Sequence, residues 1–488
     1  MMHGHGQSDG LVVPKKSPNK ADEAAEGMEE RGLTKGSLLE QNTRRTQSRI
    51  SVQSALERIR QVSKKDRKTR FTSLLHHIYS PEALLNAFYR LKRDAAPGVD
   101  GQTWTEYRVN LGKNLDDLSR RLRKGAYQSK PVRRVFIPKA DGTTRPLGVT
   151  TLEDKLVQSA TVAVLNAIYE PLFAGFSYGF RPGRGQHDAL DAVSVGITRK
   201  KVSWVLDADI RGFFDAINHD YLIRLIEHKI GDSRVIRLIR KWLKAGVLLD
   251  GTTVQTELGT PQGGSVSPVL ANIYLHYAYD CWAQRWRKER AQGDTIFVRY
   301  ADDSVAGFQH YSDAQRFLAE LRVNFRNYGL ELHPEKTRIL DFGRFALERR
   351  NERKLRKPET FDFLGFTHIC GQSRAGKFQL QRRTSRTRIT RKLSDIKAEL
   401  RKRMHHRIPE VGQWLASVVR GHIQYYGVPL NYKAISSFCH QVIRHWRFAL
   451  MRRSQKAYIT WQRMNDLASI WLPKPRIVHP YPDQRLVV

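Results

Sequence analysis

The segment Tyr300–Asp303 constrains the fold of this chain most, because it places two adjacent carboxylates between two apolar runs. Residues 296–298 and 305–308 have strand composition, so the segment between them is predicted to be a turn with acids at its tip. Neighbouring strand side chains point to opposite faces, so Asp302 and Asp303 are expected to act unequally, one binding metal and the other supporting it. Paired aspartates are also common in surface turns, and this motif alone does not establish catalysis.

A second strand with acidic residues is predicted at 204–210, where Asp207 and Asp209 alternate with apolar side chains. An aspartate at the end of a buried strand is costly unless it is paired or coordinated. Carboxylates gathered from two strands repel one another, and divalent cations are the usual remedy. Two such ions about 3.5–4 Å apart can hold the attacking and leaving oxygens of a phosphoryl transfer. A solvated Asp207 and a helix-capping Asp215 would leave Asp209 as the metal ligand.

With these two strands the chain resembles reverse transcriptases, and most closely those encoded by bacterial group II introns. Asp209 with Phe213-Phe214 resembles the first catalytic block of that family, and Tyr300–Asp303 resembles the second. Residues 259–275 resemble the block that holds the template and the incoming nucleotide. The resemblance implies an α+β right-hand polymerase fold, RNA-directed DNA polymerase activity and two Mg²⁺ ions, replaceable by Mn²⁺.

Residues 134–148 resemble the fingers hairpin of the family, with Asp141-Gly142 as a tight turn. The cations of this hairpin would face the triphosphate, where Arg offers a bidentate fork and Lys a point charge. The resemblance also places an aromatic side chain against the 2′ position of the nucleotide, and a lysine where it could protonate the pyrophosphate. The implied metal-binding residues are Asp209, Ile210, Asp302 and Asp303, of which the aspartates are catalytic. The implied nucleotide-binding residues are Lys139, Arg145, Phe214, Gln262 and Lys336.

Charge independently favours a nucleic-acid partner. The chain carries 84 Lys and Arg residues against 48 Asp and Glu, a formal net charge of +36. Such a surface attracts phosphate backbones, and its binding weakens with salt. Residues 374–403 hold twelve basic side chains and two acidic ones, more than a solvated helix face requires. With the resemblance, this predicts the RNA-binding residues Arg181, Arg184, Arg382, Arg383, Arg386, Arg388, Arg420, Tyr425, Arg452 and Arg453.

Composition and the resemblance together predict five regions. These are a disordered basic leader at 1–50, an N-terminal helical extension at 51–80, fingers and palm at 81–370, a basic thumb at 371–410, and a helical maturase domain X at 411–488. An endonuclease domain, which many relatives carry, is expected to be absent, so that a replication fork would supply the primer. Because apolar runs are too short to span a bilayer, we expect no membrane association and a soluble protein of the bacterial cytoplasm and nucleoid.

The partners that the resemblance implies are group II intron RNA, an RNA template with its DNA primer, target DNA and dNTPs, with homodimer formation left open. The expected functions are RNA-directed DNA synthesis, assistance to splicing and support of intron mobility. Two alternatives remain. One is a group II-like reverse transcriptase recruited to host repair or defence, and the other is an RNA-binding maturase without polymerase activity, which the presence of all three expected carboxylates disfavours.

Overall fold

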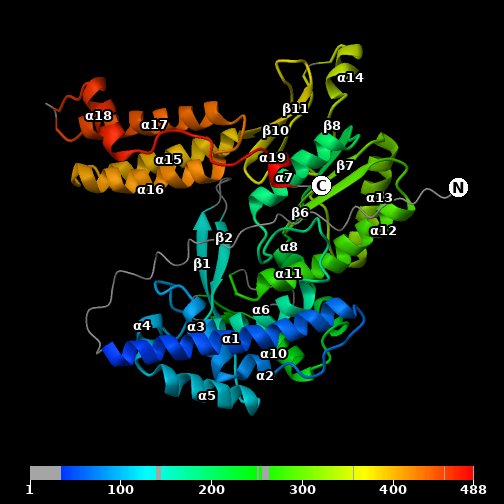
Figure 1. Ribbon diagram of the computed structural model, residues 1–488, viewed down its shortest axis with the longest axis vertical. Coiled ribbons are helices and arrows are strands. Elements are labelled where there is room, and N and C mark those ends of the chain that lie inside the picture. The colour runs from blue at the N-terminus through cyan, green and yellow to red at the C-terminus, as the bar shows by residue number, and fades with distance from the viewer. Residues whose placement is uncertain are drawn as a thin grey trace.

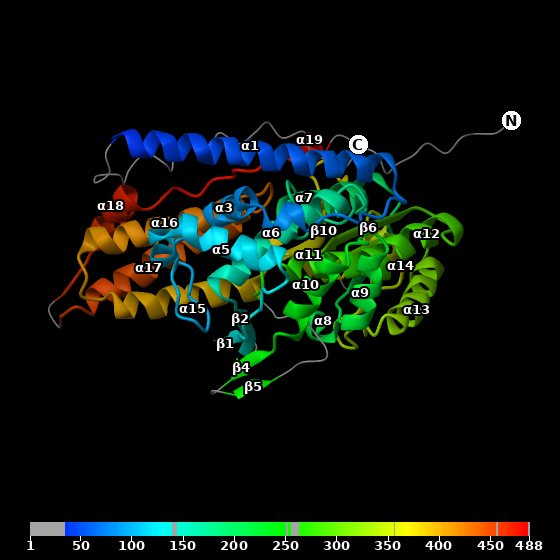
Figure 2. The same ribbon diagram turned by 90° about the horizontal axis from the view of Figure 1, so that it is seen from below.

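The computed structural model describes residues 35–138, 144–249, 252–254, 263–355, 357–454 and 457–486. A long helix, α1 (Lys35–Lys65), runs along one side of an N-terminal helical layer (Figure 1, Figure 2). The other helices of this layer are α2 (His76–Tyr79), α3 (Pro81–Arg90), α4 (Trp104–Val109), α5 (Leu111–Arg123) and α6 (Leu152–Tyr169). The predicted leader is therefore wrong over residues 35–50, which are helical, and residues 1–34 lie outside the described part of the chain.

Local sequence signals define where several of these helices begin. Ser80, Thr103 and Thr151 precede α3, α4 and α6, and each side chain accepts a hydrogen bond from a backbone N–H of the first turn. Helix α6 is buried along most of its length, and the hydroxyl of Ser63 on α1 donates to the Ile168 carbonyl at 2.6 Å. The N-terminal layer is thus packed around α6.

The predicted fingers hairpin is formed by β1 (Val132–Pro138) and β2 (Thr144–Val149), which pair antiparallel. The short strands β4 (Val247–Leu249) and β5 (Thr252–Val254) extend it in the order β2-β1-β4-β5. The hairpin projects from the helical layer toward the C-terminal helices (Figure 1). The turn predicted at Asp141-Gly142 lies outside the described residues.

A second sheet carries the acidic segments. It consists of β6 (Thr295–Tyr300), β7 (Asp303–Phe308), β3 (Trp204–Ala208) and β8 (Arg338–Asp341), paired antiparallel in that order. Alternate residues of β3 enter different hydrophobic cores, Leu206 on one face and Val205 on the other. The carboxylates are therefore held at the end of a strand with apolar packing on both faces.

Helices cover both faces of this sheet. On the Leu206 face lie α11 (Ser267–Leu275), the π-helical turn η2 (His276–Asp280), α12 (Cys281–Glu289) and α13 (Tyr311–Asn327). On the other face lies α7 (Gln186–Arg199). Between β3 and α11 the chain forms α8 (Phe213–Ala216), α9 (His219–Glu227) and α10 (Ser233–Lys244).

The C-terminal part contains a small sheet and a helical body. The sheet is β9 (Phe361–Phe363), β10 (Phe366–Gln372) and β11 (Phe378–Thr384), and α14 (Ala346–Glu352) precedes it. The helical body contains α15 (Arg386–Lys402), α16 (Ile408–Tyr426), α17 (Tyr432–Met451) and α18 (Trp461–Trp471). The short helix α19 (Pro482–Arg485) returns to α7 (Figure 1).

Two predicted boundaries fall inside packed parts of the structure. The boundary at 370/371 would cut through β10, which pairs along its whole length with β11. The boundary at 410/411 would divide one hydrophobic core, in which Ile396 and Leu400 of α15 pack with Val411 and Leu415 of α16. The predicted thumb and domain X thus share a single packed unit that begins after Thr384. Among the described residues, no helix combines the length and apolar character needed to cross a membrane.

Candidate active site

Strand pairing brings the acidic segments together. Ala208 lies opposite Ser304 in the β3–β7 pair, so Asp209 and Asp303 leave the sheet at the same end. The β6–β7 hairpin pairs Tyr300 with Asp303, leaving Ala301 and Asp302 as its two-residue turn. The predicted turn with acids at its tip is therefore confirmed.

A cavity of about 870 Å³ opens at this end of the sheet, and Asp207, Asp209 and Asp303 contribute to its lining. Its lining also includes Arg388 and Arg391 of α15. Asp207 was predicted to be solvated, but its side chain is only 24% exposed and faces this cavity. Asp215, predicted to cap a helix, lies inside α8, whose N-cap is Gly212.

Burial and neighbouring carboxylates raise the pKa values of Asp303 and Asp207. The pKa of Asp303 is raised to about 7, first by desolvation within the concave site and then by the negative charges of Asp302, Asp209 and Asp207. Desolvation likewise raises the pKa of Asp207 to about 6, while the Arg338 guanidinium opposes the shift. Negative charge has thus accumulated here beyond what the nearby cations neutralise.

The chemistry of this cluster fits a divalent cation, since hard cations bind carboxylate oxygens and would relieve their repulsion. The Lys336 ammonium supplies part of the missing positive charge at 3.0 Å from Asp209 Oδ2. In the part of the chain that the structure describes, no three His, Cys, Asp or Glu side chains surround one point closely enough to form a complete metal site.

Backbone contacts fix the segment after β3. The Asp209 carbonyl accepts a hydrogen bond from the His333 N–H at 2.8 Å, and Ile210 forms a β-bridge with Leu332. Ile210 itself is 6% exposed. These contacts attach the Asp209 segment to the residues just before Lys336, so the cation and the carboxylate are held in one local unit.

A second cavity of about 730 Å³ continues the first along α15 and α16. The two share Arg388, Arg391, Tyr425 and Tyr426. The Tyr425 hydroxyl donates to the Leu364 carbonyl at 2.8 Å, which fixes its ring at the junction. The acidic site and the basic α15 surface are thus two ends of one groove.

Comparisons with known proteins agree with this geometry. A family model described as reverse transcriptase (RNA-dependent DNA polymerase) matches residues 137–368. The group II intron-encoded protein LtrA of Lactococcus lactis subsp. cremoris is 38% identical over 222 residues, 45% of this chain and 37% of LtrA. Protein YkfC of Escherichia coli K12 is 34% identical over 271 residues, 49% of this chain and 71% of YkfC. This chain belongs to the group II intron reverse transcriptase/maturase family.

A fungal relative of the family is also similar. It is an uncharacterized 91 kDa protein in the cob intron of Schizosaccharomyces pombe, 36% identical over 276 residues. The chain spans only 34% of that protein and 37% of LtrA, against 71% of YkfC. The family model's range, residues 137–368, contains the acidic site described above.

Of the nucleotide-binding residues implied by the family, two are described with their side chains. Phe214 on α8 is half-buried against Phe213, with ring centroids 5.3 Å apart. Lys336 lies at the carboxylates. Lys139, Gln262 and the side chain of Arg145 lie outside the described residues, so their roles stay predictions.

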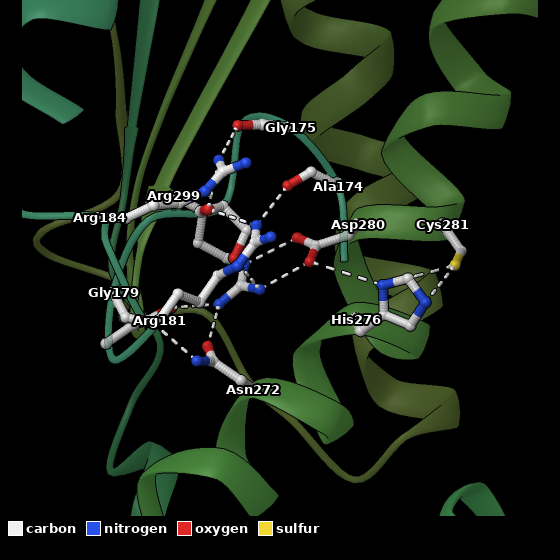
Figure 3. Close-up of polar contacts among 12 residues, drawn as sticks. Ala174, Gly175, Gly179, Arg181, Arg184, Asn272, His276, Asp280, Cys281 and Arg299 are labelled. Carbon is white, nitrogen blue, oxygen red and sulfur yellow. Dashed lines mark hydrogen bonds and ion pairs between the residues drawn. The ribbon is translucent and has the colours of Figure 1, made fainter. Parts of the chain in front are cut away.

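Two arginines predicted to bind RNA are instead buried in the protein. Arg181 donates to the Ala174 carbonyl (Figure 3). It also donates to the Ser177 carbonyl and the Glu170 carboxylate. Arg382 is 3% exposed and pairs with Asp191 at 2.6 Å. Both predictions are wrong, because each guanidinium is already neutralised inside the fold.

The remaining predicted RNA-binding residues lie at or near the surface. Arg184 is half-buried, since it donates to the Gly175 carbonyl (Figure 3) and its guanidinium stacks over Tyr178. Arg453 donates to the His406 carbonyl. The exposed arginines are Arg383, Arg386, Arg388, Arg420 and Arg452. Their contact with RNA stays a prediction.

Proposed function

We propose that this chain is an RNA-directed DNA polymerase that also binds group II intron RNA, to assist splicing and support intron mobility. The observation that carries the proposal is the groove in which Asp209 and Asp303 face the basic residues Arg388 and Arg391. A phosphate backbone lying against the arginines would bring a primer end toward the carboxylates. The family supplies the nucleic-acid substrate class.

In this proposal Asp209, Asp302 and Asp303 hold two Mg²⁺ ions, with Ile210 beside them. When bound, the ions lower the pKa of the primer 3′-hydroxyl and neutralise the triphosphate. Lys336 is 63% exposed, so its ion pair with Asp209 is weak and its ammonium can turn toward the pyrophosphate, which it would protonate. Phe214, which follows Asp209 in the sequence, would crowd a 2′-hydroxyl on the incoming nucleotide.

The test is primer extension by Asp209→Asn and Asp302→Asn, alongside filter binding to RNA. Each substitution removes metal-binding charge, so synthesis should fall roughly 10³-fold or more, while RNA binding stays near that of the unsubstituted chain. Asp116→Asn is the matched control, because Asp116 is an exposed residue of α5. Substantial synthesis by either active-site variant would overturn the assignment.

Splicing assistance is tested separately, with an intron whose splicing at near-physiological magnesium requires the protein. Asp209→Asn should still assist splicing, since the carboxylate acts in synthesis and not in RNA binding. Loss of synthesis with retained splicing would support a bifunctional protein. If Asp209→Asn folds normally but loses both synthesis and splicing assistance, this would argue against a separate maturase activity.

A further inference from the structure

The turn that carries Asp302 and Asp303 is attached to a buried guanidinium that sequence analysis did not single out. Arg299 precedes the turn in β6, and only 1% of its surface is exposed. Its Nε and Nη2 donate to the two oxygens of Asp280 at 2.7 and 2.6 Å (Figure 3). Its Nη2 also donates to Ser177 Oγ at 2.8 Å. A buried cation needs such partners. The contacts with Asp280 and Ser177 alone would be consistent with a purely structural role.

The other side of the guanidinium faces the turn. Arg299 Nη1 donates to the Ala301 carbonyl at 2.9 Å and to Asn272 Oδ1 at 3.1 Å. Ala301 has φ 57°, a left-handed backbone conformation that residues other than glycine rarely adopt. Such a conformation persists only when the surrounding structure imposes it. The Arg299 contact is directed at the peptide that links Ala301 to Asp302.

Asn272 connects the same group to a second contact of the turn. Its amide donates to the Gly179 carbonyl at 2.7 Å (Figure 3). Gly179 packs so closely on the turn that a Cβ atom there would lie 2.2 Å from the Ala301 nitrogen. Asn272 therefore holds both the guanidinium and the glycine backbone that confine Ala301.

The π-helical turn η2 explains how two residues of one helical segment reach the same guanidinium. Asn272 and Asp280 are eight residues apart, which in a regular α-helix leaves them about 80° apart around the axis. The wider turn at His276–Asp280 reduces the rotation per residue and brings the two side chains toward one face. Such turns inside helices frequently mark functional sites.

We propose that Arg299 is a positioning residue, which with Asp280 and Asn272 sets the orientation of the turn that presents Asp302 and Asp303 to the cavity. The proposal rests on the proposed function, in which these aspartates bind Mg²⁺. Arg299 does not contact the cavity, so its effect on synthesis would pass through the backbone of Ala301.

Arg299→Lys is the first test, because it keeps the charge but loses the planar fork. We expect the magnesium concentration for half-maximal synthesis to rise about tenfold and kcat to fall on the order of 100-fold. Binding of Mn²⁺, followed by electron paramagnetic resonance with Asp302→Asn as background, should weaken in parallel. Arg349→Lys is the matched control. Like Arg299, Arg349 pairs with a carboxylate, in this case Asp341 of β8, but its contacts lie away from the turn.

Asn272→Ala is the second test, because it leaves the Arg299–Asp280 pair intact and should fold where Arg299→Lys fails to. Asn272→Ala should also raise the magnesium concentration for half-maximal synthesis and weaken Mn²⁺ binding. Each effect should be smaller than in Arg299→Lys. If Asp302→Asn is inactive while both variants match Arg349→Lys in magnesium dependence, the positioning role is wrong and the proposed function stands. If Asp302→Asn synthesises DNA normally, the proposed function itself is wrong.

Discussion

Two groups of arginines in this molecule share a residue type and differ in what surrounds them. Arg299 and Arg382 are buried, with carboxylate partners, whereas Arg386, Arg388 and Arg391 are exposed along α15. The buried group stabilises the fold, whereas Arg388 and Arg391 of the exposed group line the groove beside the acidic site. Whether an arginine belongs to one group or the other depends on its partner rather than on the local density of charge.

The partners lie far away in sequence. Arg382 pairs with a residue 191 positions earlier, and Arg299 with one 19 positions earlier. The dense basic segment 374–403 therefore mixes the two groups, and its charge overstates the surface available to a phosphate backbone. The following predictions test this distinction.

The largest effect on stability is expected for Arg382→Ala. Removing one partner of a buried ion pair should lower the free energy of unfolding by about 3–5 kcal/mol, and the remaining partner of Asp191, Arg485, places the loss toward the lower end. Urea denaturation measures it. Arg383→Ala is the control, because the neighbouring side chain on β11 is exposed and should cost less than about 0.5 kcal/mol. Equal losses would remove the distinction between buried and exposed arginines.

The next effect is on RNA binding. Changing Arg386, Arg388 and Arg391 together to Gln should lower the slope of log affinity against log salt by about 2–3, since each phosphate contact contributes roughly 0.7–0.9. Stability should change little. An equal-charge control replaces Arg120, Arg123 and Lys124 at the exposed end of α5, on the far side of the molecule (Figure 1). A slope that is unchanged by the α15 variant would show that RNA lies elsewhere.

Comparison of the α15 variant with a second arginine variant separates maturation from synthesis. Arg388 and Arg391 line the acidic cavity, so primer extension should fall along with splicing. Arg420→Gln, an exposed change outside that cavity's lining, should affect splicing more than extension. Parallel loss of both activities in Arg420→Gln would assign this surface to the polymerase duplex.

A smaller effect is expected from pH, through the carboxylates opposite these arginines. With the pKa of Asp303 raised to about 7, its carboxyl is largely protonated at pH 6 and ionised at pH 8. Protons compete with the cation, so the magnesium concentration for half-maximal synthesis should fall about tenfold between pH 6 and 8. Without metal, the folded chain holds this proton more tightly than the unfolded chain, so stability should decrease as pH rises from about 4 to 7. A magnesium requirement independent of pH would contradict the raised pKa.

Sequence patterns predicted the elements that local periodicity defines. The β6–β7 turn and the two strands of the fingers hairpin are both present. Each depends on residues that are close together in the chain, where alternation or helical spacing decides which side is buried. The position of Asp209 beside Asp303 could also be inferred, since both follow apolar strands.

The sequence did not reveal contacts that depend on tertiary structure. Arg299 and Asn272 form a unit only after η2 alters the helical rotation and Gly179 reaches the turn. Asp207 is predicted to be solvated, yet the pairing with β8 and the concave site partly enclose it. The predicted boundary at 370/371 likewise follows composition, while strand pairing continues to Thr384.

The attachment of α19 to α7 has a consequence for synthesis on the ribosome. Arg485 donates to Asp188 and Asp191, residues that precede it by 297 and 294 positions. At about 5–20 residues per second, translation leaves these two aspartates without that partner for roughly 15–60 s after they are made. Helix α7 therefore reaches its final charge balance only after Arg485 has been made and α19 has packed against it.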